Sequence, residues 1–144
     1  MMNEEISSVE DIREQAVVGK ETGGMFLEGP GRLDYSVESV EVLSRALDAV
    51  QADAMQGLEL NVIQRVLAFF WGEAALVDFD DESVIYGCYL GEVLVRHAGW
   101  HWEEVPGEGY GLVREEDRVH PDRLVLAHLH GKQPVHKAVG PFLS

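Results

Sequence analysis

The chain has 144 residues, of which 46% are hydrophobic and 26% charged, as is typical of one globular domain with a hydrophobic core. Its 26 acidic residues outnumber 11 Lys and Arg residues, and the net charge of −15 argues against a nucleic-acid partner, because binding a phosphate backbone requires clustered cations. A single cysteine excludes an internal disulfide, and no run of about 18 apolar residues is present to cross a membrane. We therefore expect a cytoplasmic protein without a membrane partner, and the oligomeric state stays open.

The order of the predicted elements favours an α+β fold in which three to four helices pack on a small antiparallel sheet. Residues 1–144 are predicted to form one domain. Within it, we expect residues 1–32 to form a peripheral helix and loop, residues 33–130 the core, and residues 131–144 a tail that is irregular from Lys132 onward.

The first predicted helix covers about residues 8–18, because Ser8 can accept a backbone N–H bond at a helix start. Gly19, Gly23 and Gly24 follow and are predicted to end it.

The second predicted helix starts at the N-cap Ser36 and breaks at Gly57. Its apolar residues recur every three to four positions. They are Val37, Val40, Leu43, Leu47 and Val50.

A third helix is predicted over about residues 58–75, starting at Leu58. It is apolar on most of its surface. A helix of this kind is normally buried, so we expect a central packing element.

The fourth predicted helix, over residues 83–97, contains Gly87 and Gly91 one turn apart, and Gly99 is predicted to end it. Because a glycine in a helix interior costs about 1 kcal/mol relative to alanine, the pair indicates a close contact with another element. After it, the alternation in residues 100–105 and 110–114 predicts a β-hairpin. A short helix then starts at Pro121 and ends at Gly131.

Several of these segments carry a recognisable pattern: Gly87–Val93 (GCYLGEV), His97–Trp100 (HAGW), Leu33–Ser36 (LDYS) and Val119–Pro121 (VHP). The pattern resembles an uncharacterised bacterial domain family with a Tyr-Leu-Gly-Glu helix signature, over about residues 33–130. The resemblance implies an α+β domain of unknown function and supplies no catalytic residues.

Glu92 and Arg96 are the first candidate binding residues, because Glu92 is the charged group deepest in the fourth predicted helix. A partly buried carboxylate can act as a general base or bind a cation. Alternatively, Glu92 has a structural role, either in an i,i+4 ion pair with Arg96 or as a hydrogen-bond acceptor for the turn near Trp100.

His97 and His101 have the four-residue spacing of paired zinc ligands on a helix, but Gly99 between them is predicted to end the helix. They remain a weak alternative, and we expect no metal and no cofactor. Cys88 lies among apolar residues and is predicted to be a buried small hydrophobe rather than a nucleophile.

Trp100, Trp102 and Tyr110 are the remaining candidate binding residues. They form either part of the core or an exposed aromatic platform on the hairpin. Which tryptophan corresponds to the aromatic residue of the family pattern is left open.

The acidic charge and the absence of a convincing catalytic constellation favour a non-enzymatic protein-interaction module, of an immunity type or a regulatory type, with a basic protein partner. The alternative is a small-molecule or metal-binding domain, such as a hydrolase, centred on Glu92 and the nearby histidines.

Overall fold

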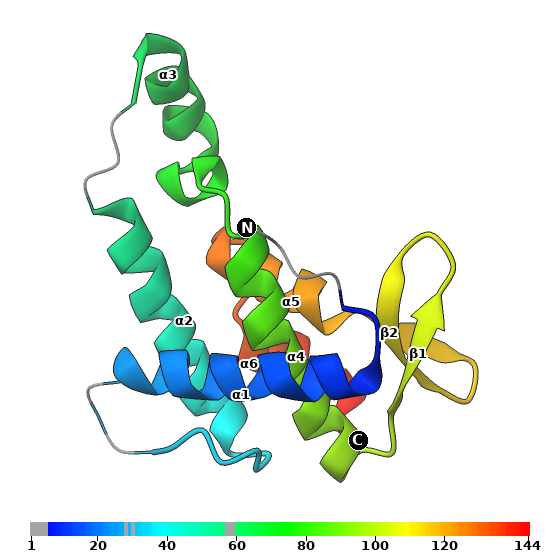
Figure 1. Ribbon diagram of the computed structural model, residues 1–144. Coiled ribbons are helices and arrows are strands. Elements are labelled where there is room, and N and C mark those ends of the chain that lie inside the picture. The colour runs from blue at the N-terminus through cyan, green and yellow to red at the C-terminus, as the bar shows by residue number, and fades with distance from the viewer. Residues whose placement is uncertain (1–5, 28, 30, 57–59) are drawn as a thin grey trace.

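Helix α4 occupies the centre of the fold, and the other layers are arranged around it (Figure 1). The computed structural model describes residues 6–27, 29, 31–56 and 60–144. The fold is α+β, as predicted.

The α-helices are α1 (Val9–Met25), α2 (Ser39–Met55), α3 (Val62–Trp71), α4 (Asp80–His97), α5 (Pro121–Leu129) and α6 (Val135–Ala138). Two short 3-10 helices are η1 (Glu73–Leu76) and η2 (Gly140–Phe142), and the strands are β1 (His101–Val105), β2 (Gly109–Arg114) and β3 (Asp117–Val119).

Helix α1 runs across α4 and continues seven residues beyond its predicted end at residue 18, to Met25. Ser8 caps it as predicted, accepting a hydrogen bond from the Asp11 N–H at 3.2 Å. The prediction that Gly19, Gly23 and Gly24 end the helix is wrong, because all three lie within it, and Gly19 and Gly23 are buried. A Cβ atom on Gly19 would collide with the backbone carbonyl of Ile85 in α4, so this glycine permits close contact between the helices.

Gly87 and Gly91 lie where other elements contact α4, as predicted, and these contacts are separate from the one that α1 makes at Ile85. A Cβ on Gly87 would lie 2.6 Å from Cα of Asp122, in the first turn of α5. A Cβ on Gly91 would overlap the ring of Trp102 in β1. The missing side chains therefore allow both α5 and the hairpin to lie directly against α4, and Gly99, with a φ of 76°, follows the helix end as predicted.

The sheet has the order β1-β2-β3 with antiparallel pairing throughout. The predicted hairpin is confirmed, with Trp102 opposite Leu112 and Glu104 opposite Tyr110. The third strand, β3, was not expected from the sequence.

Residues 131–144 are not an irregular tail. They form α6 and η2, and Val135 and Val139 are fully buried in the main hydrophobic cluster. Helix α5, predicted from Pro121, begins there and ends at Leu129 before Gly131.

Helix α2 starts at Ser39, three residues after the predicted N-cap. The Ser36 hydroxyl nevertheless accepts a hydrogen bond from the Ser39 N–H at 3.2 Å. Its predicted apolar stripe is buried except for Val37, which is exposed. The break expected at Gly57 and the helix start expected at Leu58 lie outside the described residues.

Helix α3 contradicts the prediction of a central packing element, because none of its residues is buried. It extends away from the rest of the molecule, at the top of Figure 1, and its main contacts are with the adjoining η1. Asn61 begins it with a capping box, in which Asn61 and Gln64 exchange side-chain hydrogen bonds with each other's backbone N–H groups.

Across the part of the chain that the structure describes, no helix combines the length and the apolar character needed to cross a bilayer.

Candidate functional site

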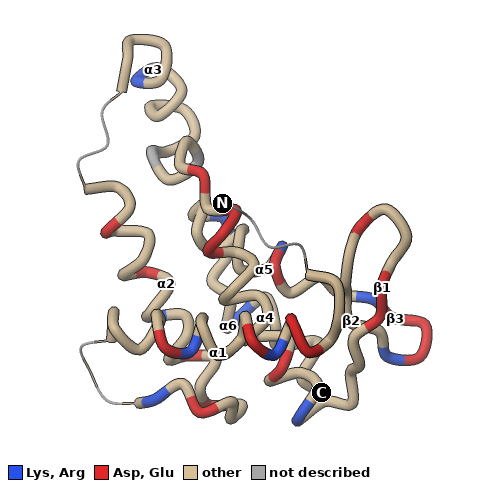
Figure 2. The backbone as a smooth tube through the Cα atoms, in the orientation of Figure 1, with Lys and Arg blue, Asp and Glu red and all other residues tan. Residues whose placement is uncertain are grey.

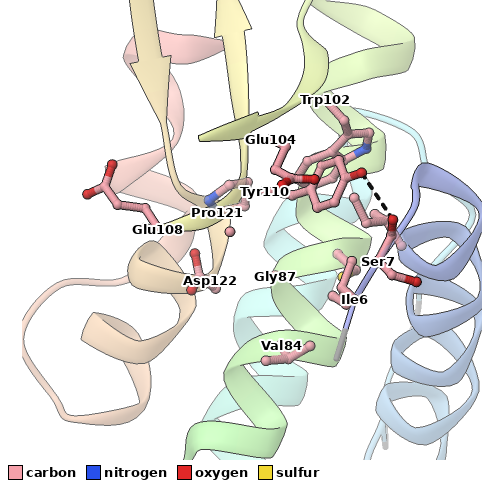
Figure 3. A pocket seen from close by; sticks show the side chains of 13 residues that line it. Ile6, Ser7, Val84, Gly87, Trp102, Glu104, Glu108, Tyr110, Pro121 and Asp122 are labelled. Carbon is pink, nitrogen blue, oxygen red and sulfur yellow. Dashed lines mark hydrogen bonds between the residues drawn. The ribbon is translucent and has the colours of Figure 1, made fainter. Parts of the chain in front are cut away.

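A cleft of about 610 Å³ opens between α4, the hairpin, the start of α5 and the segment that precedes α1 (Figure 3). This volume lies within the range of about 300–1,000 Å³ that is typical of ligand pockets. Its apolar lining comes from elements far apart in the sequence. The apolar side chains are Ile6, Ile12, Val84, Trp102, Tyr110 and Pro121.

Three carboxylates line the same cleft: Glu104 of β1, Glu108 of the hairpin turn, and Asp122 of α5. Glu108 is partly neutralised by Arg123, whose Nη2 lies 3.2 Å from Oε1. The side chains of Glu104 and Asp122 make no hydrogen bond or ion pair to another described residue, and the described lining contains no Lys or Arg. The cleft therefore presents negative charge beside an apolar surface.

Trp102 is held in the cleft wall by Glu92. The indole Nε1–H donates a hydrogen bond of 3.0 Å to Oε2 of Glu92, and the other carboxylate oxygen lies 3.7 Å from Nε of Arg13. Glu92 is only 4% exposed and does not line the cleft. Its carboxylate thus positions Trp102 and ties α4 to β1 and α1.

Arg96, expected as the ion-pair partner of Glu92, lies instead over the ring of Tyr35, with its guanidinium carbon 3.9 Å from the ring centroid. The start of the hairpin does bond to Glu92, although through the Trp102 side chain rather than through the backbone near Trp100. Glu92 therefore has a structural role, but its partners are Trp102 and Arg13 rather than Arg96 and the turn near Trp100.

The three aromatic candidates separate into different environments. Trp100 is buried in the core, where its Nε1–H donates to the carbonyl of Phe142 at 2.8 Å and Arg114 lies over its ring. Trp102 and Tyr110 are half-buried and line the cleft, and the Tyr110 hydroxyl reaches the carbonyl oxygen of Ser7 at 3.4 Å (Figure 3). The structure thus brings together two of the three aromatic candidates.

Each histidine contacts a different group of the protein. His97 and His101, the candidate metal ligands, bond to different groups. His97 bonds to the Tyr35 carbonyl and His101 to the Glu103 carboxylate, both at 2.8 Å. Among the described residues, no cluster of three or more potential metal ligands occurs. The other pairs are His120 with Glu108, His128 with Asp48, His130 with the Val77 carbonyl, and His136 with Ser44.

Cys88 lies at the base of the cleft and is buried, as predicted. Burial, together with the nearby carboxylates of Asp122 and Glu92, raises the pKa of its thiol from 9.0 to about 12. The thiolate is the nucleophile of cysteine chemistry, so Cys88 is unsuited to that role at neutral pH.

We expect Cys88 in the native protein to react with iodoacetamide at pH 8 at least about a thousand-fold more slowly than an unperturbed thiol, because a pKa higher by three units lowers the thiolate fraction by that factor. Mass spectrometry of timed samples measures the rate, and the urea-unfolded chain provides the control. Equal rates in the native and unfolded proteins would contradict the burial of this thiol.

The acidic half of the cleft was not expected from the sequence. Glu104, Glu108 and Asp122 are ordinary surface acids until the hairpin and α5 bring them together. Only Asp122 had a signal in the sequence. Gly87, a glycine in the middle of a helix, predicted a contact with another element, and the residue that contacts Gly87 is Asp122.

Comparison of the chain with protein-family models, with curated proteins and with solved structures gives no match. What the protein binds therefore has to follow from the geometry and charge of the cleft.

Proposed function

We propose that the protein is a non-enzymatic interaction module that binds a basic segment of a partner protein, with a Lys or Arg side chain of the partner inserted into the cleft. The observation that carries this proposal is the pairing of an apolar wall containing Trp102 and Tyr110 with the unpaired carboxylates of Glu104 and Asp122.

A long cationic side chain matches both halves of the cleft. Lys and Arg bury their methylene stems against apolar surface while their charged ends remain at a polar rim. Here the stem would lie against Trp102, Tyr110 and Pro121, and the cation would approach Glu104 and Asp122. The aromatic faces favour the same occupant through cation–π attraction.

The acidic composition supports a basic partner in a second way. A net charge of −15 attracts a cationic partner over long range and increases its association rate, an effect that falls with ionic strength. We further propose that this interaction takes place in the cytoplasm, in keeping with the single buried Cys88, and that the chain belongs to the bacterial family that its Tyr-Leu-Gly-Glu segment resembles.

A small-molecule or metal site centred on Glu92 has less support. The Glu92 carboxylate is buried, and both of its oxygens already face protein groups, Trp102 and Arg13. A ligand would have to displace these contacts before reaching the carboxylate.

The test uses a set of fluorescent peptides of equal length in which a central Lys or Arg flanked by apolar residues is compared with a central Gln. Fluorescence anisotropy at 50 mM salt is expected to detect binding of the Lys or Arg peptides only. Substituting both cleft acids, Glu104→Gln with Asp122→Asn, should weaken binding by about ten-fold or more, because two charge-assisted contacts are lost.

The matched control is Glu41→Gln with Asp53→Asn, which makes the same charge change on exposed positions of α2. It should weaken binding less than two-fold, by roughly the long-range contribution alone. Equal weakening by the two pairs would reduce the effect to net charge and overturn the cleft as the binding site. Binding of the Gln peptide as tightly as the Lys peptide would overturn the proposed occupant.

A further inference from the structure

Within the residues that the structure describes, helix α3 exposes an apolar surface on which no other element packs. Six of its ten side chains are apolar and between 52% and 84% exposed. They are Val62, Ile63, Val66, Phe69, Phe70 and Trp71.

Five of these six side chains form one face of the helix, and Trp71 lies about 80° beyond its edge. At 100° per residue, Val62, Ile63, Val66, Phe69 and Phe70 fall within an arc of about 120°. Arg65 lies outside this arc. An apolar arc of this width is what a helix normally buries against a core.

The exposed area is large enough for a specific interface. The five side chains of this face together expose on the order of 550 Å² of apolar surface, and Trp71 beside it adds roughly 150 Å². The largest patch on a typical monomer measures about 300–600 Å², whereas a stable protein interface buries roughly 800 Å² per partner. The α3 face, with Trp71 at its edge, therefore approaches one half of a standard interface.

The charge distribution favours a second copy of this chain as the occupant. Residues 60–72 contain Arg65 and no acid, with Glu59 and Glu73 flanking them in the sequence, although the whole chain has 26 acidic residues. Figure 2 shows the acids distributed over the body and α3 projecting beyond them. Two copies that meet through α3 thus bury apolar area while their acidic bodies stay apart, whereas contact through the bodies would bring like charges together.

The charge pattern also argues against a lipid surface. Helices that lie in a membrane interface usually carry several Lys or Arg residues on their polar face, but the polar side of α3 offers Arg65 alone.

We propose that α3 is a homodimerisation helix, in which the face defined by Val62, Ile63, Val66, Phe69 and Phe70 packs against the same face of a second copy about a two-fold axis. Closed two-fold contacts are the commonest form of self-association. Val66 lies at the middle of this face, so the axis passes near it and places the two Val66 side chains close to each other.

Sedimentation velocity of the full chain tests the proposal. We expect the wild type at micromolar concentration to have twice the chain mass of 16.0 kDa. Phe69→Glu with Phe70→Glu should raise the dissociation constant by about 30-fold or more, because aromatic residues at interface centres typically contribute this much. The matched control, Val17→Glu with Met25→Glu, changes two exposed apolar residues of α1 and should leave the dimer intact.

A cysteine at position 66 gives a geometric test. Under mild oxidation, Val66→Cys should form a covalent dimer, whereas the wild type and Met25→Cys should not, since the native Cys88 is buried. Higher salt should tighten the dimer by screening the repulsion between the acidic bodies, the opposite of its effect on binding a basic peptide.

Three results would overturn the proposal: a wild type that stays monomeric at hundreds of micromolar, a control pair that dissociates as readily as the α3 pair, or a monomer that co-floats with phosphatidylcholine vesicles through α3. Because α3 contains no buried residue, the α3 variants should keep the helical circular dichroism of the wild type. If the glutamate variants lose the helical circular dichroism, the Val66→Cys cross-link decides instead. Absence of a covalent dimer in that experiment overturns the proposal.

Discussion

Substituting Gly19 by alanine is expected to lower the free energy of unfolding by about 2–3 kcal/mol, because the added methyl group has no space. The new Cβ would collide with the carbonyl oxygen of Ile85, and this obstacle is backbone rather than a flexible side chain. Relief requires α1 to move away from α4, which uncovers Ile12 and Ala16. The loss exceeds the gain of about 1 kcal/mol that alanine brings to a helix interior.

The control is Gly24→Ala in the same helix, where no atom lies within 4 Å of the added Cβ. Gly24→Ala should raise the free energy of unfolding by about 0.5–1 kcal/mol through helix propensity alone. Urea unfolding followed by circular dichroism measures both. If the two variants shift stability in the same direction, the close crossing of α1 and α4 at Gly19 is wrong.

His128→Ala is expected to destabilise the protein by about 3 kcal/mol, because this ring joins three helices. It is buried, its Nδ1 accepts a hydrogen bond of 2.9 Å from the Val135 N–H of α6, and its Nε2 lies 2.7 Å from Oδ1 of Asp48 in α2. Since Nδ1 accepts, the ring proton is on Nε2 and is donated to Asp48. Truncation leaves a buried N–H without its acceptor and opens a cavity beneath α6.

His101→Ala serves as the matched control, because His101 also bonds to a carboxylate, that of Glu103, but lies exposed on β1. Its removal should change stability by less than about 0.5 kcal/mol. Thermal unfolding should show a melting temperature lower by roughly 6–12 °C for His128→Ala, at about 2–4 °C per kcal/mol. Similar melting temperatures for the two variants would contradict the three-helix link.

Elements whose signals are local could be predicted from the sequence. The buried stripe of α2, the start of α5 at Pro121 and the hairpin depend on periodicity and turn residues within one segment. Gly19 can be read as a helix end or as a helix contact, and the choice depends on the backbone of α4 at Ile85, 66 positions further along the chain. Local sequence therefore gave the wrong choice.

Elements that depend on distant partners were missed or misplaced. Strand β3 is three residues long and exists because β2 pairs with it. Helix α6 is one turn, and its Val135 and the following Val139 are buried in the core. For α3, the apolar composition led to a prediction of burial, but its face has no partner within the described part of the chain.

The candidate site shows the same division. Trp102 and Tyr110 could be predicted as binding candidates because aromatic residues on a hairpin are conspicuous in sequence. Glu104, Glu108 and Asp122 could not, because in a chain with 26 acids nothing distinguishes them until the fold places them around one cleft. Glu92 stood out in the sequence as the charged group deepest in its helix, and in the structure it accepts the hydrogen bond that positions Trp102.

The packing of α2 against α6 also sets a condition on how the protein folds while it is being synthesised. Ser44 and its partner His136 are 92 residues apart in the chain, so the ribosome needs roughly 5–20 seconds to produce the second after the first. Once residues 62–71 have been made, the apolar stripe of α2 and the exposed face of α3 are both present before α6, one of the helices that pack against α2, is synthesised. The nascent chain is therefore most prone to aggregation, and most dependent on chaperones, before residues 135–139 emerge.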